Sequence, residues 1–165
     1  MAAGLPSTVL TVADVRRAEL ESLFSPHGLT LIEVPVDEPI PGSYWGDEEA
    51  GLIEDRLYLR ADTPIHSVLH EGGHWLCAQA RGRGNLHTDA ASDDAEENAV
   101  CYLQILLADR ITGFGRQRAW ADMDAWGYSF RLGSAQAWFE RDADDALAWL
   151  QTHAAHLLDG TITPT

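Results

Sequence analysis

Two histidines four residues apart, His70 and His74, enclose Glu71 in the sequence His-Glu-Gly-Gly-His. On an α-helix, residues four apart lie on one face, about 6 Å apart along the axis, so both imidazoles can face one metal ion. Neutral imidazole nitrogen is a good zinc ligand, and Glu71 falls beside the pair, where its carboxylate can accept a proton from water. Zinc in hydrolytic sites usually has three protein ligands and one open position, so a third ligand is expected downstream.

The third ligand is expected on a second helix, and Glu96 is the first candidate. Counted from Glu96, the apolar residues that fall on one helical face are Ala99, Val100, Leu103, Leu106 and Leu107. A carboxylate at the end of such an inward face is costly to bury, and a bound dication would compensate it. Glu97 is the alternative, on a face that continues to Cys101 and Gln104 and that we expect to be more exposed. Weaker candidates, in the polar segment before the helix, are Asp93, Asp94 and His87.

The helix that carries the two histidines is expected over residues 64–81. Thr63 can cap free backbone donors, and the fixed φ of Pro64 suits a first helical turn. Gly82 follows the helix as an end signal. The apolar neighbours of the motif, which predict a largely buried helix, are Ile65, Val68, Leu69, Trp75 and Leu76. Gly72 and Gly73 each cost about 1 kcal/mol in a helix interior, which indicates close approach of substrate or of another backbone.

The other elements predict an α+β fold with a thin sheet. After a loose start over residues 1–10, a short amphipathic helix is expected to end near Pro26 and Gly28. Strands are expected over 29–36 and 52–60, and helices over 95–111, 134–141 and 142–158. No repeat or long linker divides the chain, so residues 1–165 are expected to form a single domain.

Composition excludes several classes of function. The chain has 165 residues, 45% of them hydrophobic, and a formal net charge of −15. All 11 basic residues are arginines in no large block, so nucleic-acid binding is disfavoured, whereas a basic protein partner would be favoured. No stretch approaches the roughly 20 apolar residues of a membrane span, and no signal peptide precedes the fold, so a cytoplasmic location is expected. The two cysteines, Cys77 and Cys101, are expected to be buried thiols.

A family resemblance arises from the motif helix, the alternating strand before it and the segment Glu96-Glu97-Asn98-Ala99-Val100-Cys101-Tyr102-Leu103 after it. Together they resemble the glutamate-zincins, and among these the ImmA/IrrE-type intracellular metallopeptidases, whose second motif also has a small residue three after the ligand glutamate and an aromatic six after it. The resemblance covers roughly residues 50–110. It implies a zincin-like fold, in which a small twisted sheet packs on the HExxH helix and a second ligand-bearing helix, with additional C-terminal helices here.

The resemblance also implies a zinc-dependent peptidase, and it has one departure. The family often has Asn or Asp four residues after the ligand glutamate, where this chain has Val100. The hydrogen bond that orients a ligating imidazole must therefore come from elsewhere or be missing. The C-terminal third of the chain lies outside the resemblance, so the substrate is not indicated.

Hydrolysis at such a site gains from a donor to the developing oxyanion. Tyr128 is the first candidate, because it lies in the aromatic-rich, glycine-interrupted segment 122–131, which reads as a shaped loop near the site; Arg131 and His153 are further candidates. Ordinary core packing is the competing interpretation of these aromatic residues.

Two other functions stay open at the level of sequence. The first is a non-catalytic zinc-binding module that stabilises the fold or holds a protein partner. Such a closed site requires a fourth ligand, for which the candidates are His66, His87 and Cys77. Glu71 beside the first histidine favours catalysis, since a structural site has no need of a general base. The second is a zinc hydrolase of a non-peptide bond. For the peptidase the expected partner is a polypeptide substrate, and for the zinc-binding module it is a protein.

Overall fold

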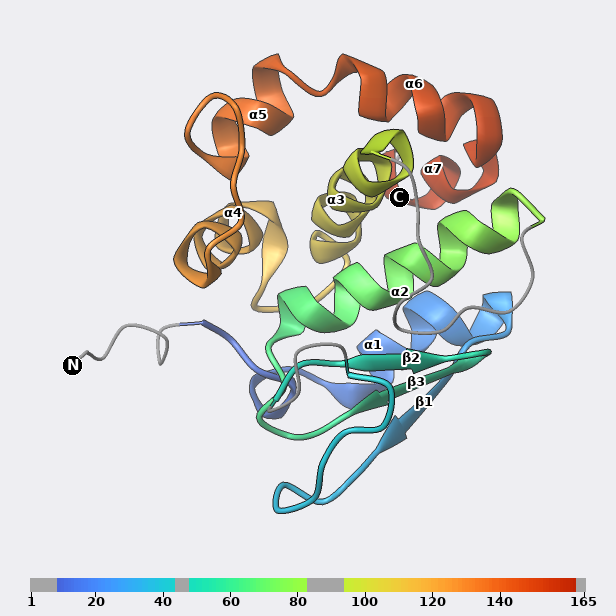
Figure 1. Ribbon diagram of the computed structural model, residues 1–165, viewed down its shortest axis with the longest axis vertical. Helices are drawn as coiled ribbons and strands as arrows, with labels where there is room; N and C mark the ends of the chain where they lie inside the picture. The colour runs from blue at the N-terminus through green and yellow to red at the C-terminus, as the bar shows by residue number, and fades with distance from the viewer. Residues whose placement is uncertain (1–8, 44–47, 83–93, 163–165) are drawn as a thin grey trace.

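The chain folds into a small mixed sheet covered by helices, which confirms the predicted α+β class (Figure 1). The computed structural model describes residues 9–43, 48–82 and 94–162. Within these residues the helices are α1 (Arg17–Phe24), α2 (Ile65–Ala80), α3 (Asp94–Ala108), α4 (Gly115–Trp126), α5 (Ala135–Arg141), α6 (Asp144–His153) and α7 (Ala155–Ile162). The strands are β1 (Thr30–Glu33), β2 (Gly51–Ile53) and β3 (Arg56–Leu59), and short 3-10 turns lie at Val12–Asp14 and Ser25–His27.

The sheet has the strand order β1-β3-β2. β3 lies in the centre, parallel to β1 and antiparallel to β2, with Leu57 opposite both Leu31 and Leu52. These three leucines are buried. Since side chains opposite each other in a ladder point to the same face, the three form one apolar surface. α1 and α2 pack against the sheet.

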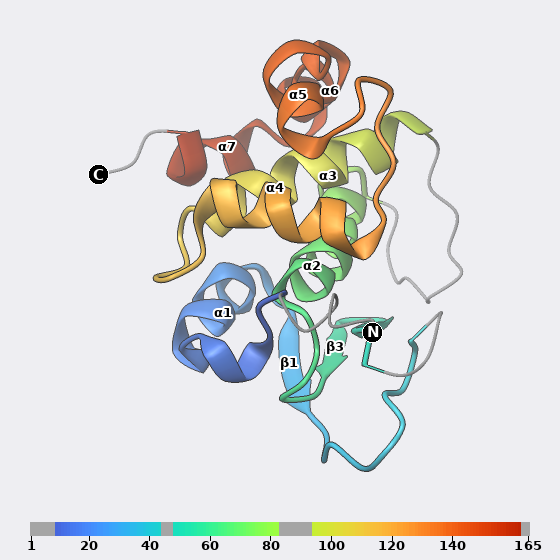
Figure 2. The same ribbon diagram turned by 90° about the vertical axis from the view of Figure 1, so that its left-hand side faces the viewer.

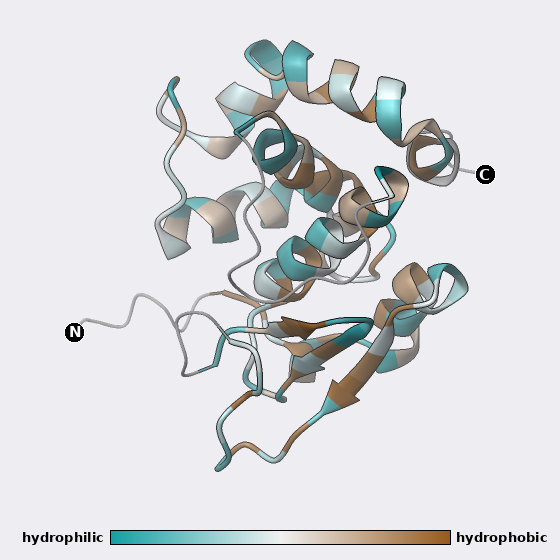
Figure 3. Ribbon diagram, turned by 45° about the vertical axis from the view of Figure 1, so that its right-hand side comes forward, coloured by the Kyte–Doolittle hydropathy of each residue, from teal (hydrophilic) through white to brown (hydrophobic). Residues whose placement is uncertain are grey.

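α2 lies between the sheet and helices α3–α7, whereas α1 lies beside the sheet (Figures 1 and 2). It contacts β2 and β3 on one side and α3 on the other. Val68 and Leu69 on α2 have no exposed surface, and most of the helix is buried. This burial, rather than intrinsic propensity, is what stabilises a helix with two glycines at its centre. Figure 3 shows the hydrophobic residues in the strands and along the inner sides of the helices.

The layer beyond α2 is built around α3, which packs against α2, α4, α6 and α7 (Figure 2). Its buried residues lie on nearly every side of the helix. One apolar cluster joins α3 to α2 and the sheet, and a second joins it to α4 and α5 through Ile105, Trp120, Met123 and Trp138. A helix enclosed in this way shows little of the one-sided pattern that marks a surface helix.

The bounds of the motif helix agree with the prediction to within one residue at each end, but its cap does not. Pro64, not Thr63, is the N-cap residue of α2. The hydroxyl of Thr63 accepts a hydrogen bond from the backbone N–H of Arg60 at 2.8 Å, so it closes the turn before the helix. α3 agrees with the predicted helix at its start and ends three residues early, and α5 begins as predicted after Ser134, whose hydroxyl accepts from the Ala137 N–H.

The prediction of one strand over 52–60 was wrong, since this segment is the β2–β3 hairpin. The chain reverses at Glu54, which has a positive φ of 54°, and Asp55. The residue that points to the apolar face has an even residue number in β2, Leu52, and the residues that do so in β3 have odd numbers, Leu57 and Leu59. Alternation counted straight through the turn could not reveal this change.

A helix and a loop predicted in the C-terminal half also differ from the structure. The single helix over 142–158 is two helices, α6 and α7, separated at Ala154, which is fully buried and has φ −144°. The break turns α7 back onto α3, a tertiary contact with no proline or glycine signal at that position. The segment 122–131 is in part the last turns of α4, and only after Gly127, whose positive φ ends the helix, does the loop carrying Tyr128 begin.

In the described parts of the chain, no helix is both long enough and apolar enough to cross a membrane.

Candidate metal centre

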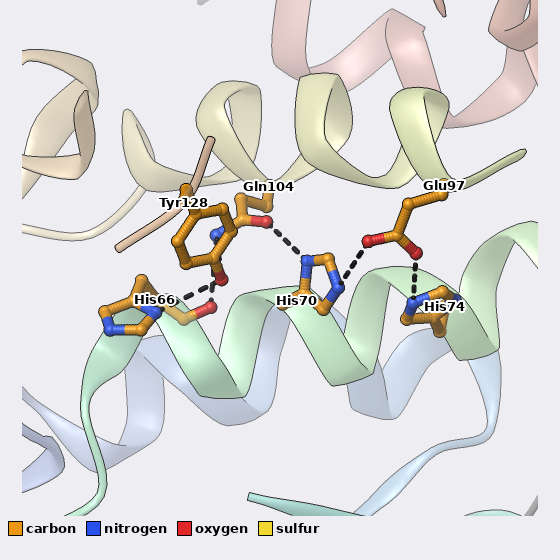
Figure 4. A network of polar contacts seen from close by, with 6 residues as sticks. All are labelled: His66, His70, His74, Glu97, Gln104 and Tyr128. Carbon is orange, nitrogen blue, oxygen red and sulfur yellow. Dashed lines mark hydrogen bonds and ion pairs between the residues drawn. The ribbon is translucent and has the colours of Figure 1, made fainter. Parts of the chain in front are cut away.

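The histidines of the motif lie side by side on the face of α2 that turns toward α3 (Figure 4). The ring centroids of His70 and His74 are 4.8 Å apart, and the two rings meet edge to face. Their side chains keep 15% and 18% of their surface exposed. The helical spacing therefore brings both imidazoles together, as predicted, at a place that solvent can reach.

Glu97 joins the two imidazoles from the first turn of α3. Its Oε2 lies 3.1 Å from Nε2 of His70, and its Oε1 lies 2.9 Å from Nε2 of His74 (Figure 4). One ligand atom from each of the three residues lies within 4.8 Å of the others. Across the described residues, this is the group of histidine, cysteine and acidic side chains that could hold a metal ion.

Glu96, the first candidate for the third ligand, is not part of this group. Its side chain has no exposed surface, and its Oε1 lies 2.8 Å from Nη1 of Arg81 at the end of α2. A buried carboxylate does require compensation, but here a guanidinium supplies it. The face of Glu97, Cys101 and Gln104 was expected to be the more exposed one, which holds for Glu97 itself, at 44%, and not for Cys101 and Gln104, which are buried. The error was to expect the third ligand on the more buried face. The structure thus brings the alternative, Glu97, to the histidines.

The other proposed ligands divide into two sets. His87 and Asp93 lie outside the described residues. Asp94 is exposed at the start of α3, and neither it nor His66 nor Cys77 belongs to the group around His70. Burial raises the pKa of the Cys77 thiol to about 12, and the nearby Glu96 adds to this shift. Among the described residues the group therefore has three members, without a fourth protein ligand.

In the absence of metal, the charges within the group favour an ionised Glu97 carboxylate and a protonated His70 imidazole. Burial raises the pKa of Glu97, but hydrogen bonds from His70 and His74 outweigh it and lower that pKa well below its usual range. Burial lowers the pKa of His70, but Tyr128, Cys101 and Glu97 outweigh this and raise that pKa well above its usual value. A site that attracts protons in this way has the charge to attract a metal cation.

Glu71 follows His70 and is half-buried. Burial raises the pKa of its carboxyl group, the neighbouring imidazoles of His70 and His74 act in the opposite direction, and Glu97 and Glu49 raise it further. The net shift is upward. A carboxylate with a raised pKa beside two possible metal ligands has the character of a general base.

The two glycines of the motif allow α2 to lie close to its neighbours. A Cβ atom at Gly72 would lie 2.4 Å from the ring of Phe24 on α1, and one at Gly73 would lie 3.2 Å from Cγ1 of Val100 on α3. The close approach is therefore made by a side chain at Gly72, and by a side chain and the backbone carbonyl oxygen of Val100, at 3.7 Å, at Gly73. Gly73 lets α3 approach the helix that carries the histidines.

A second set of polar groups continues from His70 toward the start of α2 (Figure 4). Nδ1 of His70 lies 2.8 Å from Oε1 of Gln104, and Nε2 of Gln104 lies 3.1 Å from the carbonyl oxygen of His66. The hydroxyl of Tyr128 lies 3.2 Å from Nδ1 of His66 and 3.5 Å from Nε2 of Gln104. Gln104, His66 and Tyr128 thus form a buried connection between α2, α3 and the loop after α4.

Tyr128 lies beside the centre, with its ring centroid 5.8 Å from that of His70. Burial raises the pKa of its hydroxyl to about 12, so the group stays protonated at neutral pH. Its hydroxyl faces His66 and Gln104, and donation to an oxyanion stays a prediction. The other two donors are elsewhere: Arg131 pairs with Asp142, and His153 packs on Trp149.

Sequence reasoning placed Gln104 on the face of Glu97 but assigned it no role. The signal was present, because residues seven apart on a helix lie two turns apart on the same side. The polar side chain at that place is fully buried, which requires hydrogen-bond partners. Here the partners are on α2, and one of them is a member of the candidate metal centre.

Comparison of the chain with protein families, with curated proteins and with solved structures found no match. The chemistry of this site therefore has to be argued from its own geometry. Two imidazoles and one carboxylate on two packed helices are a set of donors typical of zinc sites with an open position.

Proposed function

We propose that this protein is a zinc-dependent hydrolase, most simply a peptidase, in which His70, His74 and Glu97 hold the metal. The observation that carries the proposal is the placement of Glu97: the fold brings one carboxylate from α3 to both imidazoles of the motif on α2, at 3.1 and 2.9 Å. The HExxH spacing alone would leave the metal with two ligands. The resemblance to glutamate-zincins supports the same function through the HExxH helix alone, because Ala99 and Tyr102 lie three and six residues after Glu96 but not after Glu97.

The three donors fit a zinc ion. With metal–ligand distances of about 2.0–2.2 Å and tetrahedral angles, ligand atoms lie about 3.3 Å apart. Oε2 of Glu97 lies within a few tenths of an ångström of that separation from Nε2 of His70, and Oε1 does so from Nε2 of His74. The three ligand atoms lie within 4.8 Å of one another, so side-chain rotation would have to bring them closer around one ion. Nitrogen and oxygen donors of this kind suit zinc, and three protein ligands leave a position open for water. Glu97 keeps 44% of its side chain exposed, so the open side is accessible to solvent.

Glu71 is the general base of the proposed reaction. A zinc ion at this site would lower the pKa of a water molecule toward about 7 and polarise a substrate carbonyl. Glu71 accepts the proton from the attacking water and then donates it to the leaving amine. It has to be ionised at the start of the reaction, and the positive charge of a bound zinc ion would favour its ionised form. The raised pKa lets the same group hold the proton afterwards.

The fold supports a peptide substrate only through the zincin-like arrangement. The small sheet packs on the HExxH helix, and the second helix supplies the acidic residue, as the resemblance implies. β2 is at the edge of the sheet and contacts α2, but the segment at Gly42 lies against its backbone, since a Cβ atom there would be 3.2 Å from the nitrogen of Leu52. Backbone pairing of an extended peptide with this edge would require that segment to move. β3, in the middle of the sheet, has no free edge for this role.

Metal content and hydrolysis of an unfolded protein substrate test the proposal, with Glu71→Gln as the matched variant. One zinc per chain in both forms, with cleavage only by the wild-type protein, is the expected result. Zinc bound by both forms without cleavage of peptides or small esters would favour the non-catalytic module. Cleavage of esters alone would favour a non-peptide hydrolase, and failure to bind stoichiometric zinc in a metal-replete preparation would refute the proposal.

A further inference from the structure

Gln104 occupies a place from which it can determine the orientation of a metal ligand. It lies on α3 seven residues after Glu97, so both side chains leave the same side of that helix. Its side chain has no exposed surface. Its amide therefore makes its hydrogen bonds with protein groups. The partners are Nδ1 of His70 and the carbonyl oxygen of His66, one helical turn apart on α2, and the hydroxyl of Tyr128.

The amide of Gln104 can be oriented in only one way that satisfies its neighbours. Its nitrogen lies 3.1 Å from the backbone carbonyl oxygen of His66, and a carbonyl oxygen only accepts hydrogen bonds. The NH₂ group must therefore face His66, because the flipped amide would bring two acceptors together in a buried place. The hydroxyl of Tyr128, 3.5 Å from the same nitrogen, lies on the side where the second N–H can be directed.

This orientation determines the tautomer of His70. With the NH₂ group turned to His66, Oε1 of Gln104 faces Nδ1 of His70 at 2.8 Å. An amide oxygen has no proton to donate, so Nδ1 of His70 must carry one. When Nε2 is deprotonated to bind a metal ion, it is then the nitrogen with the free lone pair. Nε2 lies 3.1 Å from Oε2 of Glu97, on the side of the candidate metal centre; without metal that carboxylate accepts a hydrogen bond from Nε2–H, so both ring nitrogens carry a proton.

We propose that Gln104 is the positioning residue of the centre: it holds His70 in the Nδ1–H tautomer, with Nε2 directed at the metal. Gln104 thereby supplies the hydrogen bond that the family pattern led us to expect from a residue four after the ligand. The proposal builds on the proposed metal site, but the tautomer of His70 is a property of the protein that can be measured without metal. Groups that orient a ligating histidine in this way typically contribute about 10–100-fold to metal affinity.

The competing interpretation is a buried amide that only joins α2 to α3. Both interpretations expect Gln104→Met, which has a similar volume and no hydrogen bonds, to lower stability. Only the positioning role expects a change at His70. Gln104→Glu helps to separate them, because it keeps an acceptor toward Nδ1 of His70 and loses the donor toward His66. Leu103→Met is the matched control, since it places the same side chain at a fully buried neighbouring position in the apolar core.

Long-range ¹H–¹⁵N NMR of histidine-labelled protein reads the tautomer, first in metal-free Glu97→Ala protein, where no carboxylate competes for the Nε2 proton, and then in zinc-loaded protein with Glu97 in place. In the metal-free Glu97→Ala background we expect His70 to carry its proton on Nδ1 when residue 104 is Gln, with Leu103→Met or with Gln104→Glu, and to populate both tautomers with Gln104→Met. Zinc affinity should fall about 10–100-fold in Gln104→Met and change little in Leu103→Met.

Two results would overturn the inference. One is metal-free Glu97→Ala protein in which His70 carries its proton on Nε2, which decides the question even if the Gln104 variants do not fold. The other is a folded Gln104→Met protein with an unchanged His70 tautomer and unchanged zinc affinity. If Glu97→Ala protein has the expected tautomer but wild-type protein binds no zinc, the proposed function fails and the orienting hydrogen bond is still demonstrated.

Discussion

Glu96 and Glu97 are neighbours on α3, but Glu97 contacts the two histidines and Glu96 is buried against Arg81. The same substitution at each position therefore distinguishes an effect on zinc binding from an effect on stability. Glu97→Gln replaces the carboxylate that lies within 3.1 Å of both imidazoles of the motif, and we expect most of the zinc affinity to be lost. Glu96→Gln leaves that carboxylate in place and removes the negative charge from the pair with Arg81. We expect zinc binding to be kept and stability to fall.

The magnitudes follow from burial. Breaking a fully buried ion pair typically costs about 3–5 kcal/mol. Arg81 keeps 33% of its side chain exposed, so water stabilises the charge left behind in Glu96→Gln. We therefore expect a loss of about 1–3 kcal/mol, which lowers Tm by about 2–12 °C for a chain of this size. Glu97 is more exposed, at 44%, and its substitution should cost the metal-free protein less than about 1 kcal/mol.

The assay is calorimetric titration of the metal-free proteins with zinc, beside thermal unfolding followed by circular dichroism. Glu97→Gln should weaken zinc binding by more than about 100-fold, because groups that merely orient a ligand are already worth about 10–100-fold. Glu96→Gln should bind zinc with nearly wild-type affinity and unfold at a lower temperature. Loss of zinc binding in Glu96→Gln, with affinity kept in Glu97→Gln, would refute the assignment of the third ligand.

Three further predictions concern packing and ionisation. Gly72→Ala should destabilise the protein by about 1–2 kcal/mol in urea unfolding, because its Cβ would lie 2.4 Å from the ring of Phe24, whereas Gly73→Ala should be nearly neutral. Cys77 is buried, which raises its pKa to about 12, so native protein at pH 8 should resist iodoacetamide and denatured protein should react; rapid native labelling would contradict this. Burial lowers the pKa of His66 from 6.5 to about 3, so between these pH values His66 is protonated in the unfolded chain and neutral in the folded protein. The free energy of unfolding, measured with urea, should therefore decrease as the pH falls from 6.5 toward 3. A histidine NMR signal of His66 that titrates near 6.5 in the folded protein would count against the last prediction.

The helix of the motif illustrates what can be predicted from local rules. Its start after Thr63 and Pro64, its end at Arg81 and the shared face of His70 and His74 depend on residues a few positions apart, and the structure agrees with all three to within one residue. The same rules failed at the β2–β3 hairpin and at the α6–α7 break. There the deciding interactions are strand pairing and packing on α3, which involve residues far apart in the sequence.

The sequence by itself determined that His70, Glu71 and His74 lie on one helix, with both imidazoles on the same face, because residues four apart lie on one side of any α-helix. Only the tertiary structure decided between Glu96 and Glu97. Adjacent helical residues point about 100° apart, and α3 is buried on nearly every side, so its apolar pattern did not distinguish the face toward α2 from the others. Packing of α3 on α2 turned Glu97 toward the histidines, left Glu96 to pair with Arg81, and placed Gln104 against His70.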